Sequence, residues 1–177
     1  MDETLNDFDI TSDYDRSIIF YAPLRESLKL TNGSGNITQI PEAVFKTYNG
    51  NSGVSLSKDQ YLKYESYSNL PQSGSLIFEF CATNEQQCRS KTILFNYGIS
   101  PNTIKIFIKN NILYKQIGHF TDILISNIKI NKWYNIKEGI VWNGIDTRRN
   151  PYFYLGTLKY PFTGYIRNVK INKILQT

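Results

Sequence analysis

The feature that most constrains the fold is a two-residue periodicity in hydrophobicity that recurs along most of the chain. Isoleucine alternates with other residues in 104–109 (IKIFIK), and a second run, 112–117 (ILYKQI), follows Asn110-Asn111. Successive side chains of a strand point to opposite faces of a sheet, so this alternation predicts strands with one buried face. Asparagine tolerates the left-handed backbone of a two-residue turn, so Asn110-Asn111 is predicted to close a hairpin.

Other segments repeat this pattern at short intervals, and together they predict eleven or twelve strands. The remaining predicted strands cover residues 17–22, 44–48, 54–56, 60–65, 75–81, 92–97, 121–126, 133–142, 152–156 and 162–173. No window shows a sustained 3.6-residue repeat, so at most one helical turn is expected, at residues 40–43. The longest break, residues 24–43, is predicted to be a loop that crosses between sheets. This organisation predicts an all-β fold, a two-sheet antiparallel jelly-roll sandwich.

The phase of the alternation also assigns side chains to the inward faces of the strands. The predicted inward set is Phe20, Leu76, Phe78, Phe80, Leu94, Ile106, Ile136, Phe162, Ile166 and Ile171. Gly164 is expected to let the chain bend into the last strand without a side chain in the way. Ile166, Val169 and Ile171 do not keep one alternation, so a β-bulge near Arg167-Asn168 is predicted to restore the phase.

Charge is unevenly distributed along the chain. The net charge is +5, but residues 1–15 hold six acidic side chains and no Lys or Arg, which leaves nine acids against 20 bases, or +11, in residues 16–177. The sequence therefore predicts an acidic arm, residues 1–16, attached to a basic β domain, residues 17–177. The lysines Lys105, Lys109, Lys115, Lys129 and Lys132 are spaced singly along predicted strands. Such spacing is typical of solvated strand faces, so nucleic acid is not the expected partner.

The acidic arm carries four large apolar side chains, Leu5, Phe8, Ile10 and Tyr14. Exposed ion pairs contribute only about 0–1 kcal/mol each, so docking of the arm would depend largely on these apolar anchors. A domain with a closed core has few spare grooves for four anchors. A neighbouring protein chain is therefore the expected receptor, and the arm is predicted to act in assembly.

The sequence predicts neither a signal peptide nor a membrane-spanning segment. The start, MDETLNDFD, lacks the apolar run of a signal peptide, so none is expected. No stretch of 18 apolar residues predicts a membrane-spanning segment.

The cysteines and the single histidine offer little chemistry. Cys81 and Cys88 flank a six-residue polar loop and could pair across the ends of a hairpin, although their redox state stays open. A zinc site needs four ligands, and the chain has one histidine, His119, so zinc is not expected. His119 lies in a predicted turn, where a solvated or capping role is favoured.

Five segments, taken in order, resemble the concanavalin A-like lectin/glucanase superfamily, in particular laminin G-like domains. They are residues 20–24 (FYAPL), 48–64 (a glycine-containing strand pair), 74–80 (GSLIFEF), 131–136 (NKWYNI) and 154–171, which closes with FTGYIRNVKI. The resemblance covers about 155 residues. It implies two antiparallel sheets packed face to face, with one concave side.

The resemblance also defines which chemistry to look for. Some glucanases of that superfamily place two carboxylates on one strand with the pattern Glu-x-Asp-x-x-Glu, and this pattern is absent here. Glu79 and Glu138 stand alone in their predicted strands, and a bulge at Gly139 is expected to turn Glu138 outward. Calcium in lectin-like members needs clustered oxygens, whereas Asp59, Asp122 and Asp146 lie in separate loops. No enzymatic activity, metal or cofactor is therefore expected.

A saccharide site needs aromatic faces for sugar rings and amides for their hydroxyl groups. Six residues near predicted strand ends or loops offer these groups: Tyr64, Tyr67, Trp142, Asn143, Tyr152 and Tyr154. Packing in the core or at its rim is the alternative explanation for such aromatic side chains, including Trp133 and Trp142.

Two roles follow as hypotheses. The first is a decoration or attachment protein of a virion, such as a bacteriophage capsid or tail, since phage proteins leave the cell by lysis without a signal peptide. The second is a free lectin or cell-adhesion module, located outside the cell or on its surface. Surface glycans are possible partners in both.

Overall fold

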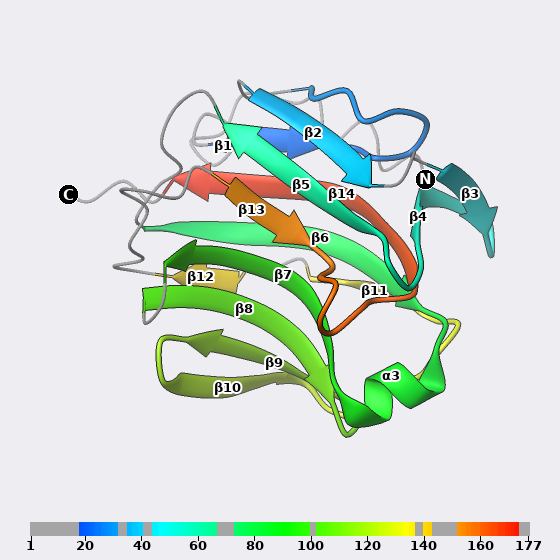
Figure 1. The fold of residues 1–177 in the computed structure, drawn as a ribbon, viewed down its shortest axis with the longest axis vertical. Helices are drawn as coiled ribbons and strands as arrows, with labels where there is room; N and C mark the ends of the chain where they lie inside the picture. Colours follow the sequence, from blue (N-terminus) through cyan, green and yellow to red (C-terminus); the bar gives the residue numbers. More distant parts are fainter. Residues whose placement is uncertain are drawn as a thin grey trace.

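The computed structural model describes residues 18–31, 35–40, 44–66, 73–99, 102–136, 140–142 and 152–173, and they form a two-sheet sandwich of antiparallel strands (Figure 1). The strands are β1 (Ile18–Ala22), β2 (Gly35–Ile40), β3 (Val44–Tyr48), β4 (Asn51–Leu56), β5 (Tyr61–Ser66), β6 (Gly74–Ala82), β7 (Thr92–Ile99), β8 (Asn102–Lys109), β9 (Ile112–Ile117), β10 (Phe120–Ile125), β11 (Trp133–Asn135), β12 (Ile140–Trp142), β13 (Tyr152–Leu155) and β14 (Gly164–Lys173). A short helix, α3 (Glu85–Ser90), joins β6 to β7.

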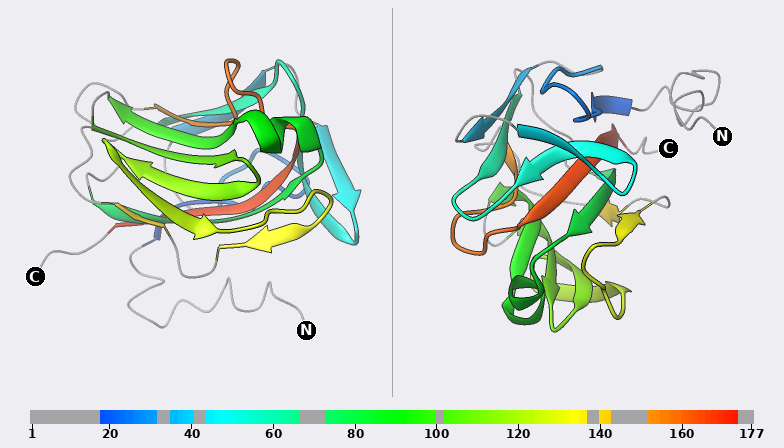
Figure 2. Two further views of the ribbon diagram at one scale, coloured as in Figure 1. Left: turned by 90° about the horizontal axis from the view of Figure 1, so that it is seen from below. Right: turned by 90° about the vertical axis from the view of Figure 1, so that its right-hand side faces the viewer.

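In the described part of the chain, each sheet has seven strands. The first follows the order β11-β6-β14-β4-β3, with β1 beside β14 and β12 beside β6. The second follows the order β10-β9-β8-β7-β13-β5-β2. Figure 2 shows the two sheets as separate layers. Every strand pair in the described residues is antiparallel, which confirms the predicted all-β sandwich.

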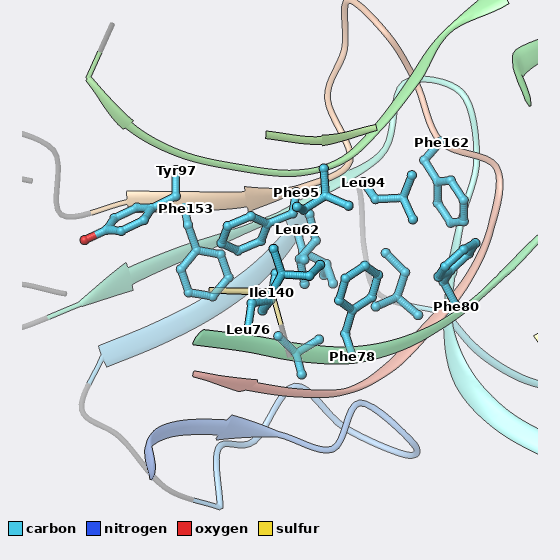
Figure 3. Packing of buried hydrophobic residues seen from close by; sticks show 14 of the residues in the cluster. Leu62, Leu76, Phe78, Phe80, Leu94, Phe95, Tyr97, Ile140, Phe153 and Phe162 are labelled. Carbon is cyan, nitrogen blue, oxygen red and sulfur yellow. The ribbon is translucent and has the colours of Figure 1, made fainter. Parts of the chain in front are cut away.

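The predicted register is confirmed for most of the core. Nine of the ten predicted inward side chains are fully buried, namely Phe20, Leu76, Phe78, Phe80, Leu94, Ile106, Phe162, Ile166 and Ile171. In Figure 3, Leu76 and Phe78 from β6 point towards Leu94, Phe95 and Phe153 from the opposite sheet. Ile136 is the exception, because it follows the end of β11 and is only partly buried against the core.

The backbone conformation confirms two sequence predictions, a hairpin turn and a β-bulge. Asn110 and Asn111 both have positive φ, 51° and 61°, and close the β8–β9 hairpin. The register of β14 against β6 shifts between Arg167 and Lys170, where Asn168 has a φ of 52°. This irregularity is the predicted bulge, and it keeps Ile166, Val169 and Ile171 all buried.

Gly164 allows β14 to approach β6 closely. Its φ is 153°, and a Cβ placed there would lie 2.1 Å from the carbonyl oxygen of Cys81. Only a residue without a side chain fits this position, so the predicted role of Gly164 in the bend is confirmed.

Two sequence predictions about strand boundaries are wrong. The predicted loop 24–43 contains β2, whose register with β5 runs from Gly35–Ser66 to Ile40–Tyr61. The predicted single strand 133–142 is two strands, β11 and β12, which pair with different parts of β6. Long-range pairing decides both, because local propensity in Gly-rich or interrupted segments is weak.

The polar loop between the two cysteines is also different from the prediction. Residues 85–90 form α3, whose N-cap Asn84 accepts a hydrogen bond from the backbone N–H of Gln87 at 3.0 Å. Cys88 is buried on this helix and Cys81 is buried on β6, and both are free thiols. The disulfide that the spacing allowed is therefore not formed.

Candidate functional site

The outer face of the second sheet carries a polar row that crosses the sheet from strand to strand. The registers place Lys63 opposite Tyr154, Tyr154 opposite Asn96, and Asn96 opposite Lys105. Lys105 in turn lies opposite Gln116. Side chains of these positions point away from the core because their neighbours Leu62, Phe95, Phe153, Leu155 and Ile104 are buried.

One part of this outer face is hollowed into an open pocket of about 290 Å³. Its lining comes from three strands and the turn after β13: Tyr61, Asn96, Tyr154, Gly156, Thr157 and Leu158. The rings of Tyr61 and Tyr154 lie 5.9 Å apart between centroids and are tilted by 58°. Leu158, which is 58% exposed, adds an apolar side chain to the same pocket.

The side-chain oxygen of Asn96 is a buried polar atom of this pocket without a partner among the described residues. Its Oδ1 is buried and accepts no hydrogen bond from any residue that the structure describes. The hydroxyl of Thr157, by contrast, is engaged with the backbone of Tyr160, donating at 3.2 Å and accepting at 3.1 Å. A buried polar atom without a partner is uncommon in folded proteins, and a ligand is one group that can satisfy it.

The turn at Gly156 shapes one side of the pocket. Gly156 has a φ of 78°, which a residue with a side chain rarely adopts, and its N–H donates to the carbonyl of Leu94 at 2.9 Å. This bond ties the end of β13 to β7. The turn thereby brings Thr157 and Leu158 beside Tyr61 and Tyr154.

The six predicted glycan-binding residues have different locations. Tyr64 and Trp142 are core residues, 2% and 1% exposed, so their prediction as binding residues is wrong. Tyr154 lines the pocket, and Tyr152, two residues earlier on β13, holds the Lys63 ammonium 4.1 Å from its ring. Tyr67 and Asn143 lie outside the described residues.

Two pocket residues, Tyr61 and Asn96, were not singled out from the sequence. Both follow from the strand phase, since Tyr61 alternates with buried Leu62 and Asn96 lies between buried Phe95 and Tyr97. What the sequence does not show is that β5, β7 and β13 are neighbours. The pairing of the strands, and not the spacing of motifs, therefore creates this pocket.

Glu79, one of the carboxylates considered for catalysis, has a buried partner. Its Oε1 accepts a hydrogen bond from Nη2 of Arg167 at 3.0 Å, and its Oε2 accepts one from the Asn168 side-chain amide. The carboxylate of Glu79 is therefore held in a buried ion pair. Glu138 lies outside the described residues, as do Asp146 and the arm residues Leu5, Phe8, Ile10 and Tyr14.

Other sites weighed from the sequence can be placed as follows. His119 is exposed in the turn between β9 and β10, as predicted. Within the described ranges, no group of three or more His, Cys, Asp or Glu side chains gathers in a way that could hold a metal ion. No helix in the described part of the chain is both long enough and apolar enough to cross a membrane.

The sequence itself matches no known family model and no curated protein. The fold, however, is similar to receptor-binding domains of botulinum neurotoxins. The serotype D binding domain matches with a TM-score of 0.67 and 14% identity, over 90% of this chain and 48% of that chain. The serotype D ligand-binding domain in complex with N-acetylneuraminic acid matches with a TM-score of 0.65 and 15% identity, over 90% and 48%.

A third match is a structure of botulinum neurotoxin type C. It is described with the statement that cell entry of this toxin depends on interaction with two ganglioside molecules. Its TM-score is 0.64 and its identity 13%, over 93% of this chain and 50% of that chain. The chain thus spans about half the length of these solved structures. At such low identity the likeness establishes the β-sandwich fold, while the laminin G-like branch stays a prediction from the sequence.

Proposed function

We propose that this chain is a non-enzymatic binding module that holds a saccharide on the outer face of its second sheet. The observation that carries the proposal is the buried amide oxygen of Asn96, which has no donor among the described residues, in a residue that lines a pocket with two tyrosines. A site with a few placed polar groups among aromatic side chains is the usual form of a small-ligand pocket. At about 290 Å³ this one suits a single sugar ring.

Saccharides match the chemistry of the lining. A hydroxyl group of the sugar would donate to Oδ1 of Asn96, and the rings of Tyr61 and Tyr154 would contact the apolar faces of C–H groups. Within the polar row, Lys63 lies next to Tyr154 and Lys105 lies next to Asn96, and both lysines can donate to further hydroxyl oxygens. No acid–base pair is needed for any of these contacts, which supports binding rather than turnover.

The comparisons support the same class of function. Proteins of this fold include neurotoxin domains described with N-acetylneuraminic acid or gangliosides as partners. Glu79 supports the non-enzymatic assignment, because its carboxylate is already engaged by Arg167 and Asn168.

For the biological setting, we propose a decoration or attachment role within a larger assembly such as a virion. The acidic arm supports this setting, because its apolar residues would anchor the module on a neighbouring chain. A free lectin is the alternative. The presence of this chain in purified particles from its source would support the first setting, and its recovery as a separate monomer would support the second.

The saccharide pocket can be tested with a glycan array followed by titration of the best ligand. Asn96→Ala and Tyr154→Ala are each expected to weaken binding roughly tenfold or more, which corresponds to about 1.4 kcal/mol. Tyr154→Phe keeps the ring and is expected to retain most of the affinity. The control Tyr48→Ala removes a partly buried tyrosine from the other sheet and is expected to leave binding unchanged.

Two outcomes would contradict the pocket. Binding that survives both Asn96→Ala and Tyr154→Ala, with the variants folded by circular dichroism, would place the saccharide elsewhere. Loss of binding in Tyr48→Ala alone would indicate that the saccharide binds on the first sheet. Absence of any glycan ligand across a broad array would contradict the function itself.

A further inference from the structure

We infer that the segment of residues 23–31, which follows β1, forms a second, separate site, which binds an oxyanion through the guanidinium group of Arg25. The segment borders a pocket of about 560 Å³ lined by residues 23–27 and 29–31. Its cationic groups are Arg25 and Lys29, and its hydroxyl groups are those of Ser27 and Thr31. Glu26 is the one carboxylate among the lining residues.

Arg25 is partly buried and has few partners among the described residues. Its Nη2 donates to Oδ1 of Asn168 at 3.3 Å, and its Nε is buried and donates to no residue that the structure describes. The Asn168 oxygen is neutral and is shared with the hydroxyl of Tyr21, which donates to it at 3.4 Å. The positive charge of Arg25 therefore has no carboxylate in contact within the described residues.

The buried carboxylate of Glu79, which also contacts Asn168, does not supply the missing charge. Both oxygens of Glu79 are taken, one by Arg167 and the other by the side-chain amide of Asn168. A partly buried guanidinium gains from a counter-charge, and the edge that carries Nε has the planar donor geometry that carboxylate, sulfate and phosphate groups match. An oxyanion from solution would complete the hydrogen bonding of Arg25.

The segment is held in place by the sheet behind it. The Pro23 carbonyl accepts from the Asn168 N–H at 2.9 Å, and the Thr31 N–H donates to the Tyr21 carbonyl at 2.9 Å. Leu24 is fully buried with a φ of 56°, an unusual conformation for a large side chain. These contacts orient Arg25 before any ligand arrives, and residues kept in such rare conformations concentrate at binding sites.

The other polar side chains of the segment would also act on a bound anion. Ser27 Oγ accepts from the Lys29 backbone N–H at 3.3 Å, which leaves its hydroxyl hydrogen free to donate to an anion. Lys29 adds a second positive charge, while Glu26 opposes binding. Removal of the Glu26 charge should therefore strengthen anion binding.

The experiment is a titration of the ¹⁵N-labelled full chain with sodium sulfate and sodium phosphate at constant ionic strength, following the arginine Nε–H resonances. The Arg25 signal is expected to shift and saturate, while the signal of Arg89 stays in place. Arg89 is the control because it is a surface arginine already paired with Glu85 at 2.6 Å. Arg25→Lys, which keeps the charge and loses the planar donor edge, is expected to weaken binding roughly tenfold.

Additional titrations identify the source of the anion and distinguish binding at this site from binding in the saccharide pocket. Glucose 6-sulfate is compared with glucose and with free sulfate: tighter binding of the sulfated sugar would indicate an acidic saccharide, and equal binding would indicate a free anion. Glu26→Gln is expected to tighten binding and Asn96→Ala to leave it unchanged. The inference is overturned if the Arg25 resonance does not move, or if Arg25 and Arg89 shift alike without saturation.

Discussion

The guanidinium of Arg167 lies 3.0 Å from the carboxylate of Glu79, directly opposite it across the β6–β14 pair. Both side chains are about one-tenth exposed, and the guanidinium also lies 5.0 Å from the centre of the Trp133 ring. The ion pair sits next to the bulge that keeps β14 in register. It links the two longest strands of the first sheet.

Removal of one member of this pair is expected to be more harmful than removal of both. Arg167→Met leaves a buried carboxylate without its counter-charge and is expected to cost about 3–5 kcal/mol in the free energy of unfolding. The double variant Glu79→Leu/Arg167→Met replaces the pair by apolar side chains and is expected to cost less. Urea unfolding of the unmodified chain and of these two variants measures both values, and a double variant less stable than the single one would contradict this account.

Gly164 and Gly50 offer a matched pair for the cost of close approach. Gly164→Ala places a Cβ against the Cys81 carbonyl, so the loss of stability is expected to reach about 3 kcal/mol or more. Gly50 has a φ of 79° but nothing within 4 Å of a Cβ, so Gly50→Ala is expected to cost only about 1–2 kcal/mol. Thermal unfolding of both variants checks the difference, and equal losses would show that the Cys81 contact is relieved by backbone movement.

Phe78 is expected to be one of the most sensitive core positions. It is fully buried between the sheets and its ring centroid lies 5.7 Å from that of Phe80. Phe78→Ala should therefore lower the free energy of unfolding by about 3–5 kcal/mol. The exposed Phe120, on β10, provides the control, because Phe120→Ala removes the same atoms from a site that is 81% exposed and should have little effect.

The two buried thiols predict a loss of stability at high pH. Burial raises the pKa of Cys81 from 9.0 to about 11, and burial together with the Glu85 carboxylate does the same for Cys88. The folded thiols thus keep their protons when those of the unfolded chain are lost. Their contribution is fully present below pH 9 and disappears as the pH rises towards 11. Urea unfolding between pH 7 and 10.5 should show this decline, and Cys81→Ala should reduce its slope.

The same burial makes both thiols slow to react in the folded protein. Alkylation with iodoacetamide at pH 8 should modify neither cysteine in the folded chain and both after unfolding in urea. Rapid modification of the native protein would show that Cys81 or Cys88 is accessible.

Deletion of residues 1–15 tests the assembly role of the acidic arm. The β domain should stay folded, because its core lies in residues 20–171, while incorporation into the proposed assembly should be lost. Circular dichroism checks the fold, and co-purification with particles checks assembly. Normal incorporation of the shortened chain would show that the arm is a passive extension.

The strands themselves were predictable from the sequence because the signal is local. Alternation in residues 104–109 and 112–117, with Asn110-Asn111 between them, needs no knowledge of the rest of the chain. The same logic placed Phe78 and Ile166 inside and located the bulge at Arg167-Asn168. Where the pattern is weak, as in β2, the strand forms because β5 offers an unpaired edge, and no local signal reveals this.

The candidate sites were decided by the tertiary structure. Tyr61, Asn96 and Tyr154 are far apart in the sequence and become neighbours only because β13 lies between β5 and β7. Likewise, Arg25 meets Asn168 because β1 pairs with β14. The sequence alone determined which residues face outward, since that depends on a period of two, whereas strand order depends on long-range packing between distant segments.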